Sequence, residues 1–173
     1  MLILIIGGAS SGKSRYAEAR LAELPGQPKI YLAMSPVTDD EMRKRVRNHQ
    51  AMRADKGFLT IERTRDLGGI EIPPGASVMI ESLTAWTANV MFADCGVNSG
   101  GHVVSAVLDD LSGLAARVRD VVIVADDIFS DGGGYDALTE EYVRTLAELV
   151  VRIAAVADEV TEVVAGMSVI WKS

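Results

Sequence analysis

Cysteine is nearly absent from this sequence, which has a single one, Cys95, among its 173 residues. One cysteine cannot form an internal disulfide, and a zinc site built from several cysteines is excluded. We expect Cys95 to be a small residue of a helix or loop rather than a nucleophile. Histidine is also scarce, with two residues, His49 and His102. His102 follows two glycines at the start of an expected helix, and we expect it at the surface.

Long hydrophobic runs are absent as well. No apolar stretch approaches the roughly 18 residues that a membrane-spanning helix needs. The first apolar run, at 2–6, is too short for the core of a signal peptide and has no basic residues before it. We therefore expect a cytoplasmic protein without a membrane span.

Positive charge is in deficit, with 17 Lys and Arg against 24 Asp and Glu and a net charge of −7. This balance argues against general binding to nucleic acid or to anionic membranes. One basic cluster stands out against the acidic background, because 6 of the 17 basic residues fall within 14 positions. They are Arg43, Lys44, Arg45, Arg47, Arg53 and Lys56.

The apolar pattern predicts one domain over residues 1–173, with neither a linker nor an internal repeat. Continuous apolar runs predict buried strands, and longer periodic segments predict helices. Strands are expected at 2–6, 29–33, 58–62, 77–80, 121–125, 159–165 and 168–171, and helices at 14–24, 38–55, 83–92, 103–118 and 137–157. This alternation predicts the α/β class, a mainly parallel sheet flanked by helices, with the last two strands as an antiparallel edge.

The most specific motif follows the first strand directly: Gly7, Gly8, Ala9, Ser10, Ser11, Gly12, Lys13 and Ser14. It fits G-x-x-x-x-G-K-[ST] between a strand and a helix, where the glycines let successive N–H groups surround a phosphate. Lys13 would reach the β- and γ-phosphates, and the hydroxyl of Ser14 would hold Mg²⁺. The alternative is a Gly/Ser-rich turn without a ligand. We predict a P-loop that binds a nucleoside triphosphate in a P-loop NTPase-like fold.

A carboxylate at the end of a neighbouring strand usually assists the P-loop serine in holding the metal. Glu81 follows the apolar run at 78–80, and Asp126 with Asp127 follows the run at 121–125. Each could instead be the first polar residue of a loop. We expect at least one of the two positions to serve the metal.

The basic cluster carries one of the two histidines. Glu41, Arg45, His49 and Arg53 recur every fourth residue and would share one face of a helix. A neutral imidazole can hydrogen-bond a phosphate or attack it, and neighbouring arginines would stabilise the transferred group while lowering the imidazole pKa. The alternative is a solvated helix face with intrahelical ion pairs.

Several further motifs have a pattern more specific than a P-loop alone. They are Tyr31-Leu32-Ala33, Asp40-Glu41-Met42, Arg45-Val46-Arg47-Asn48-His49, Thr60-x-Glu62, Glu81-Ser82-Leu83-Thr84-x-Trp86-x-x-Asn89, Ala157-Asp158-Glu159-Val160 and Val163-Val164-Ala165-Gly166. With these motifs the chain resembles, nearly end to end, the bifunctional adenosylcobinamide kinase / adenosylcobinamide-phosphate guanylyltransferase family of cobalamin biosynthesis.

The resemblance implies two reactions on a corrinoid substrate: phosphorylation of the adenosylcobinamide hydroxyl, then GMP transfer onto the new phosphate. His49 occupies the position of the histidine that becomes guanylylated, and Lys13 would neutralise the migrating phosphoryl group. GTP, ATP and Mg²⁺ are the implied ligands, with Ser14 and Glu81 on the metal. The nucleotide would also contact Arg45, Arg53, Glu62 and Glu81. The family forms a propeller-like trimer, so a homotrimer is expected.

The chain departs from the family pattern at several positions. Ser10 stands in place of the usual Arg, Met34 in place of Thr, and Phe58 lies where Trp is usual. The segment N-E-V-G-x-G-[IV]-V-P is represented here by residues 126–134, and Ala147 and Val150 stand where the family has Gly and Asn. Two alternatives therefore stay open: a P-loop kinase with another small alcohol as acceptor, and a nucleotide-binding paralogue without turnover.

Overall fold

The computed structural model describes residues 1–35, 57–93, 96–129 and 134–173. The helix expected at 38–55 lies outside the described residues, and so do Arg45, His49 and Arg53 on it. Cys95 is outside them too.

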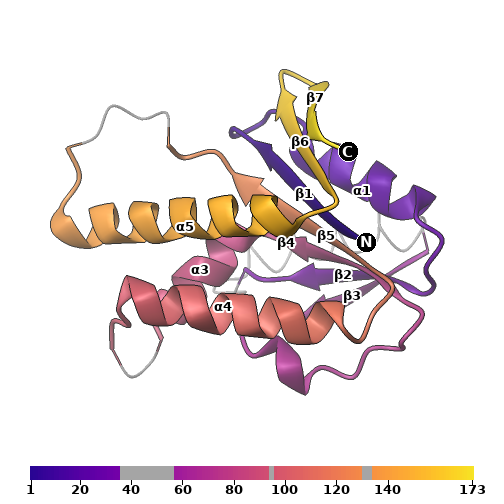
Figure 1. The fold of residues 1–173 in the computed structure, drawn as a ribbon, viewed down its shortest axis with the longest axis horizontal. Coiled ribbons are helices and arrows are strands. Elements are labelled where there is room, and N and C mark those ends of the chain that lie inside the picture. Colours follow the sequence, from indigo (N-terminus) through magenta and orange to yellow (C-terminus); the bar gives the residue numbers. More distant parts are fainter. Residues whose placement is uncertain (36–56, 94–95, 130–133) are drawn as a thin grey trace, which may run out of the picture.

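A seven-stranded sheet runs through the centre of the molecule in the order β3-β2-β4-β5-β1-β6-β7 (Figure 1). The strands are β1 Leu2–Gly7, β2 Lys29–Ala33, β3 Phe58–Glu62, β4 Ser77–Glu81, β5 Asp120–Asp126, β6 Glu159–Val164 and β7 Met167–Lys172. Strands β1 to β6 pair in parallel, and β7 pairs antiparallel with β6. The carboxyl ends of the six parallel strands therefore meet at one edge of the sheet.

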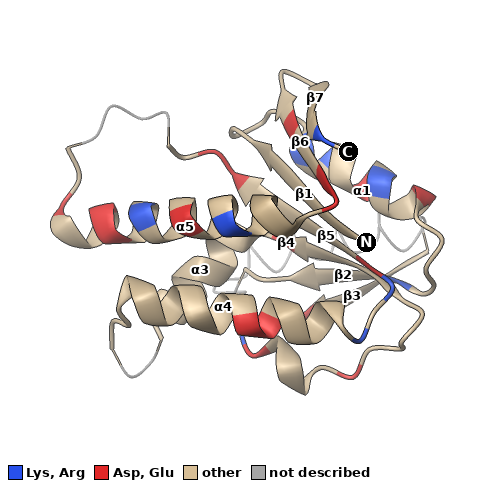
Figure 2. Cartoon of the chain, in the orientation of Figure 1, with Lys and Arg blue, Asp and Glu red and all other residues tan. Residues whose placement is uncertain are grey.

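Successive residues of the central strands alternate between two apolar cores, as the pleat of a strand requires. In β1, Leu4 belongs to one core, whereas Ile3 and Ile5 belong to the other. Strands β1, β4 and β5 carry no charged residue between their ends, and Figure 2 shows charge concentrated on the helices and strand ends. Burial on both faces explains why these strands read as continuous apolar runs.

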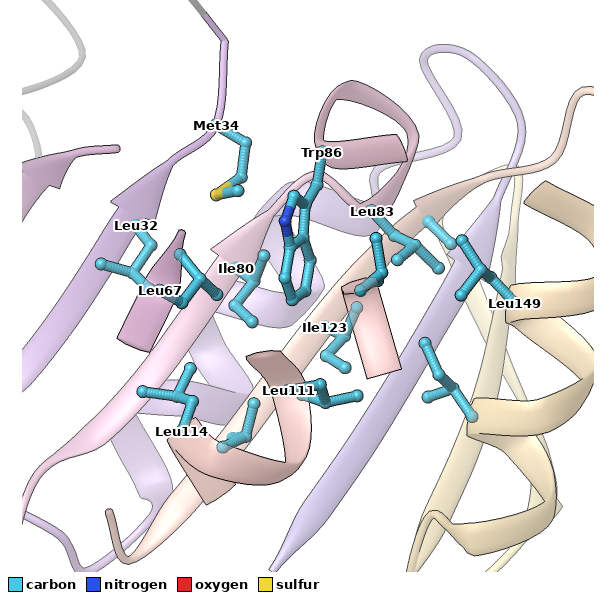
Figure 3. Close-up of a cluster of buried hydrophobic side chains, with 14 of the residues drawn as sticks. Leu32, Met34, Leu67, Ile80, Leu83, Trp86, Leu111, Leu114, Ile123 and Leu149 are labelled. Atoms are coloured by element: carbon cyan, nitrogen blue, oxygen red, sulfur yellow. The ribbon is translucent and has the colours of Figure 1, made fainter. Parts of the chain in front are cut away.

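Helices cover both faces of the sheet. Helix α1, Lys13–Glu23, packs on one face, and α3 Leu83–Met91, α4 Gly100–Ala115 and α5 Ala137–Val156 pack on the other (Figure 1). Figure 3 shows Trp86 of α3, fully buried, between Met34 and Leu83 in the larger core. A short 3₁₀ helix, Leu67–Gly69, contributes the buried side chain of Leu67 to this core. Among the described residues, no helix is long and apolar enough to cross a membrane.

The predicted fold class is confirmed, including the antiparallel edge. His102 is exposed on α4, as expected. The expected start of α4 at 103 was wrong, because α4 begins at Gly100. A Cβ at Gly100 would lie 2.5 Å from the Thr145 hydroxyl, so this glycine permits close packing of α4 against α5 rather than marking a loop. The helix also ends at Ala115, earlier than the expected 118.

Candidate active site

The loop between β1 and α1 is shaped by residues that tolerate unusual backbone geometry. Gly12 has φ 93° and Ser10 has φ 58°, both in the left-handed region. A Cβ at Gly7 would lie 2.6 Å from both the Ser11 hydroxyl and the Val163 carbonyl oxygen, so only glycine fits there. The turn between β6 and β7 supports the loop from outside, since the Gly166 N–H donates to the Ser11 carbonyl at 2.8 Å. The loop is therefore held in one shape.

Helix α1 begins immediately after this loop, with Gly12 as its N-cap and Lys13 as its first residue. The first N–H groups of a helix have no partner within the helix, and the helix dipole places partial positive charge there. Ser14 lies in this first turn. Loop and helix together form the arrangement that binds phosphate groups.

Lys13 turns back over the loop and is only 8% exposed. Its Nζ donates to the Gly8 carbonyl oxygen at 3.2 Å and lies 2.7 Å from Oδ1 of Asp126. Asp126 is the last residue of β5 and pairs in register with Gly7 of β1. The carboxylate considered from the sequence as a metal ligand is thus an ion-pair partner of the P-loop lysine.

Glu81, the last residue of β4, accepts two hydrogen bonds from distant parts of the chain. The Ser14 hydroxyl donates to its Oε1 at 2.6 Å, and the Tyr31 hydroxyl donates to its Oε2 at 2.5 Å. The structure therefore brings together Ser14 and Glu81, the two residues predicted to hold the metal.

The oxygen atoms beside the P-loop are suitable ligands for Mg²⁺. Ser14 offers a hydroxyl oxygen, and Glu81 and Asp126 offer carboxylate oxygens, the hard ligands that this ion prefers. Within the described ranges, no group of three or more His, Cys, Asp or Glu could hold a metal by itself. In phosphoryl-transfer sites Mg²⁺ is usually held by one or two protein oxygens together with phosphate oxygens. Ser14 and Glu81 fit that role.

Glu62 lies in the same row as Glu81 but farther from the loop. Both residues pair in register with Ala33 of β2, one from each side. Glu62 is exposed at the end of β3. With strands spaced about 4.8 Å apart, Glu81 is about 10 Å and Glu62 about 19 Å from the β1 end, along the sheet edge. A ligand with its phosphates on the loop would therefore reach Glu62 only with its far end.

Hydrogen bonds from α3 and α5 hold the strand ends in place. Asn89 donates to the carbonyl oxygens of Met34 and Thr64 at 2.6 and 3.0 Å, which ties α3 to the segments after β2 and β3. The Thr84 hydroxyl accepts from the N–H of Asp126 at 3.0 Å, and the Thr84 carbonyl accepts from the Tyr142 hydroxyl at 3.0 Å. This chain of contacts fixes the backbone that carries the Asp126 carboxylate.

Tyr142 is the group in this network with a displaced pKa. Burial of the phenol, with a smaller contribution from the charge of Asp126, raises the pKa of Tyr142 to about 12. Tyr142 is therefore a hydrogen-bond donor throughout the neutral range.

Tyr31 and Thr84 are site residues that were not predicted from the sequence. Both lie in the motifs that carry the family resemblance, which was the only signal for them. The Tyr31–Glu81 contact joins the neighbouring strands β2 and β4, and the Thr84–Asp126 contact joins α3 to β5. No local sequence pattern predicts contacts between such distant residues. The predicted loop residues Gly7 to Ser14 and both acidic strand ends do converge on one place.

Fold and site together define a nucleotide-binding protein of the P-loop class. A solved structure described as a prototypical ATPase from the type III secretion system of pathogenic bacteria shares the fold, with a TM-score of 0.50 and 10% identity. That likeness covers 93% of this chain and 50% of the other chain. At so low an identity it concerns the fold alone.

The sequence comparisons identify the family. The family model described as cobinamide kinase / cobinamide phosphate guanyltransferase matches residues 3–170, and the chain belongs to this family of transferases. The chain is 31% identical to the bifunctional adenosylcobalamin biosynthesis protein CobU of Salmonella typhimurium, covering 98% of each chain. It is 32% identical to the bifunctional adenosylcobalamin biosynthesis protein CobP of Pseudomonas aeruginosa, covering 95% of this chain and 93% of the other.

Proposed function

We propose that this protein phosphorylates the hydroxyl of adenosylcobinamide, with ATP or GTP as donor, and then transfers GMP from GTP to the resulting phosphate. The observation that carries the proposal is the convergence of Lys13, Ser14 and Glu81 at the P-loop. It occurs in a chain that the family model matches from residue 3 to residue 170. In this proposal, residues 1–173 form one domain that has both activities.

In the kinase reaction, the residues of the loop position the triphosphate and neutralise its charge. The N–H groups of Gly8 to Lys13 and the α1 N-terminus would surround the phosphates, and Lys13 would contact the β- and γ-phosphates. Phosphoryl transfer needs positioning and charge stabilisation more than covalent participation by the protein. A lysine that is already buried and directed at the loop suits this task.

Mg²⁺ is proposed as the companion ion of the nucleotide. Ser14 and Glu81 would hold it, and Asp126 is near enough to Lys13 to add negative charge at the same place. When bound, the ion supplies positive charge to the phosphate oxygens during transfer. Tyr31 would keep the Glu81 carboxylate facing the loop, since its hydroxyl donates to the second carboxylate oxygen.

The guanylyl transfer is proposed to proceed through His49. A neutral imidazole nitrogen would attack the α-phosphorus of GTP, forming an N–P bond while the bond to pyrophosphate breaks. The phosphate of the corrinoid would then attack the same phosphorus and release the histidine. Arg45 and Arg53 are the proposed cationic partners of the phosphates, and Glu62 the residue nearest the nucleoside end.

Labelled GTP tests the histidine step. After incubation with GTP labelled at the α-phosphorus, we expect label on the protein that is lost in acid and kept in base. The variant His49→Ala should not be labelled, whereas His102→Ala, which removes the other histidine on the exposed surface of α4, should be labelled like the wild type. Label that persists in His49→Ala would contradict the proposal.

A second candidate function is a kinase that has kept only the first reaction. The segment after β5 favours it, because residues 126–134 depart from the family pattern in the half expected to face the acceptor. In that case label would move to a small-molecule acceptor from the γ-phosphorus of GTP but never from the α-phosphorus.

We further propose that the protein is a cytoplasmic homotrimer. The edge strand β7 supports association, because Met167, Ile170 and Trp171 are 68%, 60% and 69% exposed. Large apolar side chains exposed on an edge strand can mark a contact between proteins. A second copy of the chain would cover it.

A further inference from the structure

The ion pair between Lys13 and Asp126 occupies the same ammonium group that a triphosphate needs. The lysine Nζ carries three protons, and in the structure it donates to the Gly8 carbonyl and contacts Asp126 Oδ1 at 2.7 Å. The lysine side chain is 10% exposed and the aspartate side chain 33% exposed. The pair is therefore screened by water mainly from the aspartate side.

The backbone of Asp126 is held beside the P-loop. Its N–H is bonded to Thr84 Oγ1 at 3.0 Å, and the N–H of the next residue, Asp127, donates to the Gly7 carbonyl at 2.9 Å. Both bonds fix the backbone on either side of the carboxylate. A phosphate that binds Lys13 thus approaches a negative charge whose backbone stays next to the loop.

We propose that Asp126 competes with the triphosphate for Lys13 and thereby makes nucleotide binding depend on Mg²⁺. Without the metal, the phosphates must share the ammonium with the aspartate or displace it, and in both cases they lie against its charge. A Mg²⁺ ion held by Ser14 and Glu81 would supply positive charge that offsets this repulsion. This inference rests on the proposed nucleotide site and adds to it a residue that sets affinity.

The substitution Asp126→Asn isolates the charge with little change in shape. Asparagine has nearly the same size as aspartate and keeps the backbone N–H that bonds to Thr84, so the variant should fold. Asp127→Asn is the matched control, because it removes one negative charge at the next residue, whose carboxylate accepts from the N–H of Phe129. Asp126→Ala removes the same carboxylate in a second way.

The test is calorimetric titration of each protein with GTP, once with a chelator and once with Mg²⁺. We expect Asp126→Asn and Asp126→Ala to bind metal-free GTP about fivefold more tightly than the wild type, the factor that corresponds to about 1 kcal/mol. Mg²⁺ should raise their affinity by a smaller factor than it raises that of the wild type. Asp127→Asn should stay within about twofold of the wild type in both titrations.

The outcomes separate this inference from the proposed function. A wild-type protein that binds no GTP with Mg²⁺ would overturn the nucleotide site itself. A wild type that binds GTP, with Asp126 variants that match it in metal-free affinity and in the effect of Mg²⁺, would overturn only the competition. Thermal unfolding of each variant confirms that the compared proteins are folded.

Discussion

Glu81 illustrates how single residues define this site. Its two carboxylate oxygens accept from Ser14 at 2.6 Å and from Tyr31 at 2.5 Å, and these donors come from α1 and β2. A carboxylate with both oxygens hydrogen-bonded has a fixed orientation, which a metal ligand needs. The serine can exchange this bond for one to the metal, whereas the tyrosine, which is 5% exposed, can keep its bond.

We predict that Tyr31→Phe weakens the binding of Mg²⁺ with nucleotide without abolishing it. The variant removes one of the two hydrogen bonds that orient Glu81, so the affinity should fall about 10-fold, and the free energy of unfolding should fall by about 1 kcal/mol. Titration calorimetry and urea unfolding measure the two quantities. Tyr16→Phe is the control, because Tyr16 packs against the same core but its hydroxyl makes no hydrogen bond to another described residue. Equal affinities for all three proteins would contradict the positioning role of Tyr31.

Tyr142 gives a prediction for alkaline pH. Burial, with the charge of Asp126, raises the pKa of Tyr142 from 10.0 to about 12 in the folded protein. The neutral phenol is thus favoured by folding. Its contribution to stability is complete below about pH 10 and is lost as the pH rises towards about 12.

The variant Tyr142→Phe tests this contribution. It should lower the free energy of unfolding near neutral pH by about 1 kcal/mol, because the bond to the Thr84 carbonyl is lost. It should also make the decline of stability from about pH 9 to about pH 11 less steep than in the wild type. Urea unfolding across this range measures both effects, and an unchanged alkaline slope would show that Tyr142 does not cause the decline.

The strand, loop and helix at 2–23 form the element on which the phosphate site depends. Gly7 must lack a side chain, because a Cβ would lie 2.6 Å from the Val163 carbonyl oxygen of the adjacent strand β6. A Cβ at Gly8, by contrast, would have no other atom within 4 Å. Of these two neighbouring glycines, only Gly7 is therefore required by packing.

We predict that alanine at Gly7 destabilises the fold, whereas alanine at Gly8 does not. Gly7→Ala should lower the free energy of unfolding by about 1–3 kcal/mol, the usual cost of overpacking. Gly8→Ala should leave it nearly unchanged. Thermal or urea unfolding of the two variants side by side gives the comparison. If Gly8→Ala were as destabilising as Gly7→Ala, the steric argument for Gly7 would be wrong.

At the level of elements, the sequence predicted much of the fold and part of the site. The strands are continuous apolar segments, and the glycine, lysine and serine spacing of the P-loop is typical of one loop geometry. Both could therefore be located from the local sequence pattern. The start of α4 at Gly100 could not be located in this way. The glycine is explained by the close approach of Thr145 of α5, which the local sequence does not reveal. The Lys13–Asp126 ion pair could not be predicted without knowing that β5 lies next to β1 in the sheet. The two residues are 113 positions apart in the sequence, and the pairing of these strands brings them together.

On the scale of the whole molecule, the parallel sheet explains why the site lies where it does. The strand ends that carry Gly7, Glu62, Glu81 and Asp126 all face the same edge, at which α/β proteins commonly bind ligands. The net charge is −7, so a triphosphate is not attracted by the molecule as a whole. In the proposed function, binding comes instead from local groups, namely the loop N–H groups, Lys13 and the proposed Mg²⁺.

The oligomeric state is the prediction that belongs to the whole molecule. We expect light scattering on the purified protein to give the mass of three chains of 18.5 kDa each. Charge introduced into the exposed β7 edge, as in Ile170→Lys with Trp171→Lys, should shift the mass towards that of one chain. A wild-type mass of one chain would contradict the trimer.

In the proposed function, one chain carries out both reactions on a corrinoid. Mass spectrometry of adenosylcobinamide incubated with this protein, GTP and Mg²⁺ tests it most directly. We predict two products in sequence, first adenosylcobinamide carrying one phosphate and then the same molecule carrying GMP on that phosphate. Unchanged adenosylcobinamide, under conditions in which the protein binds GTP, would contradict the claim.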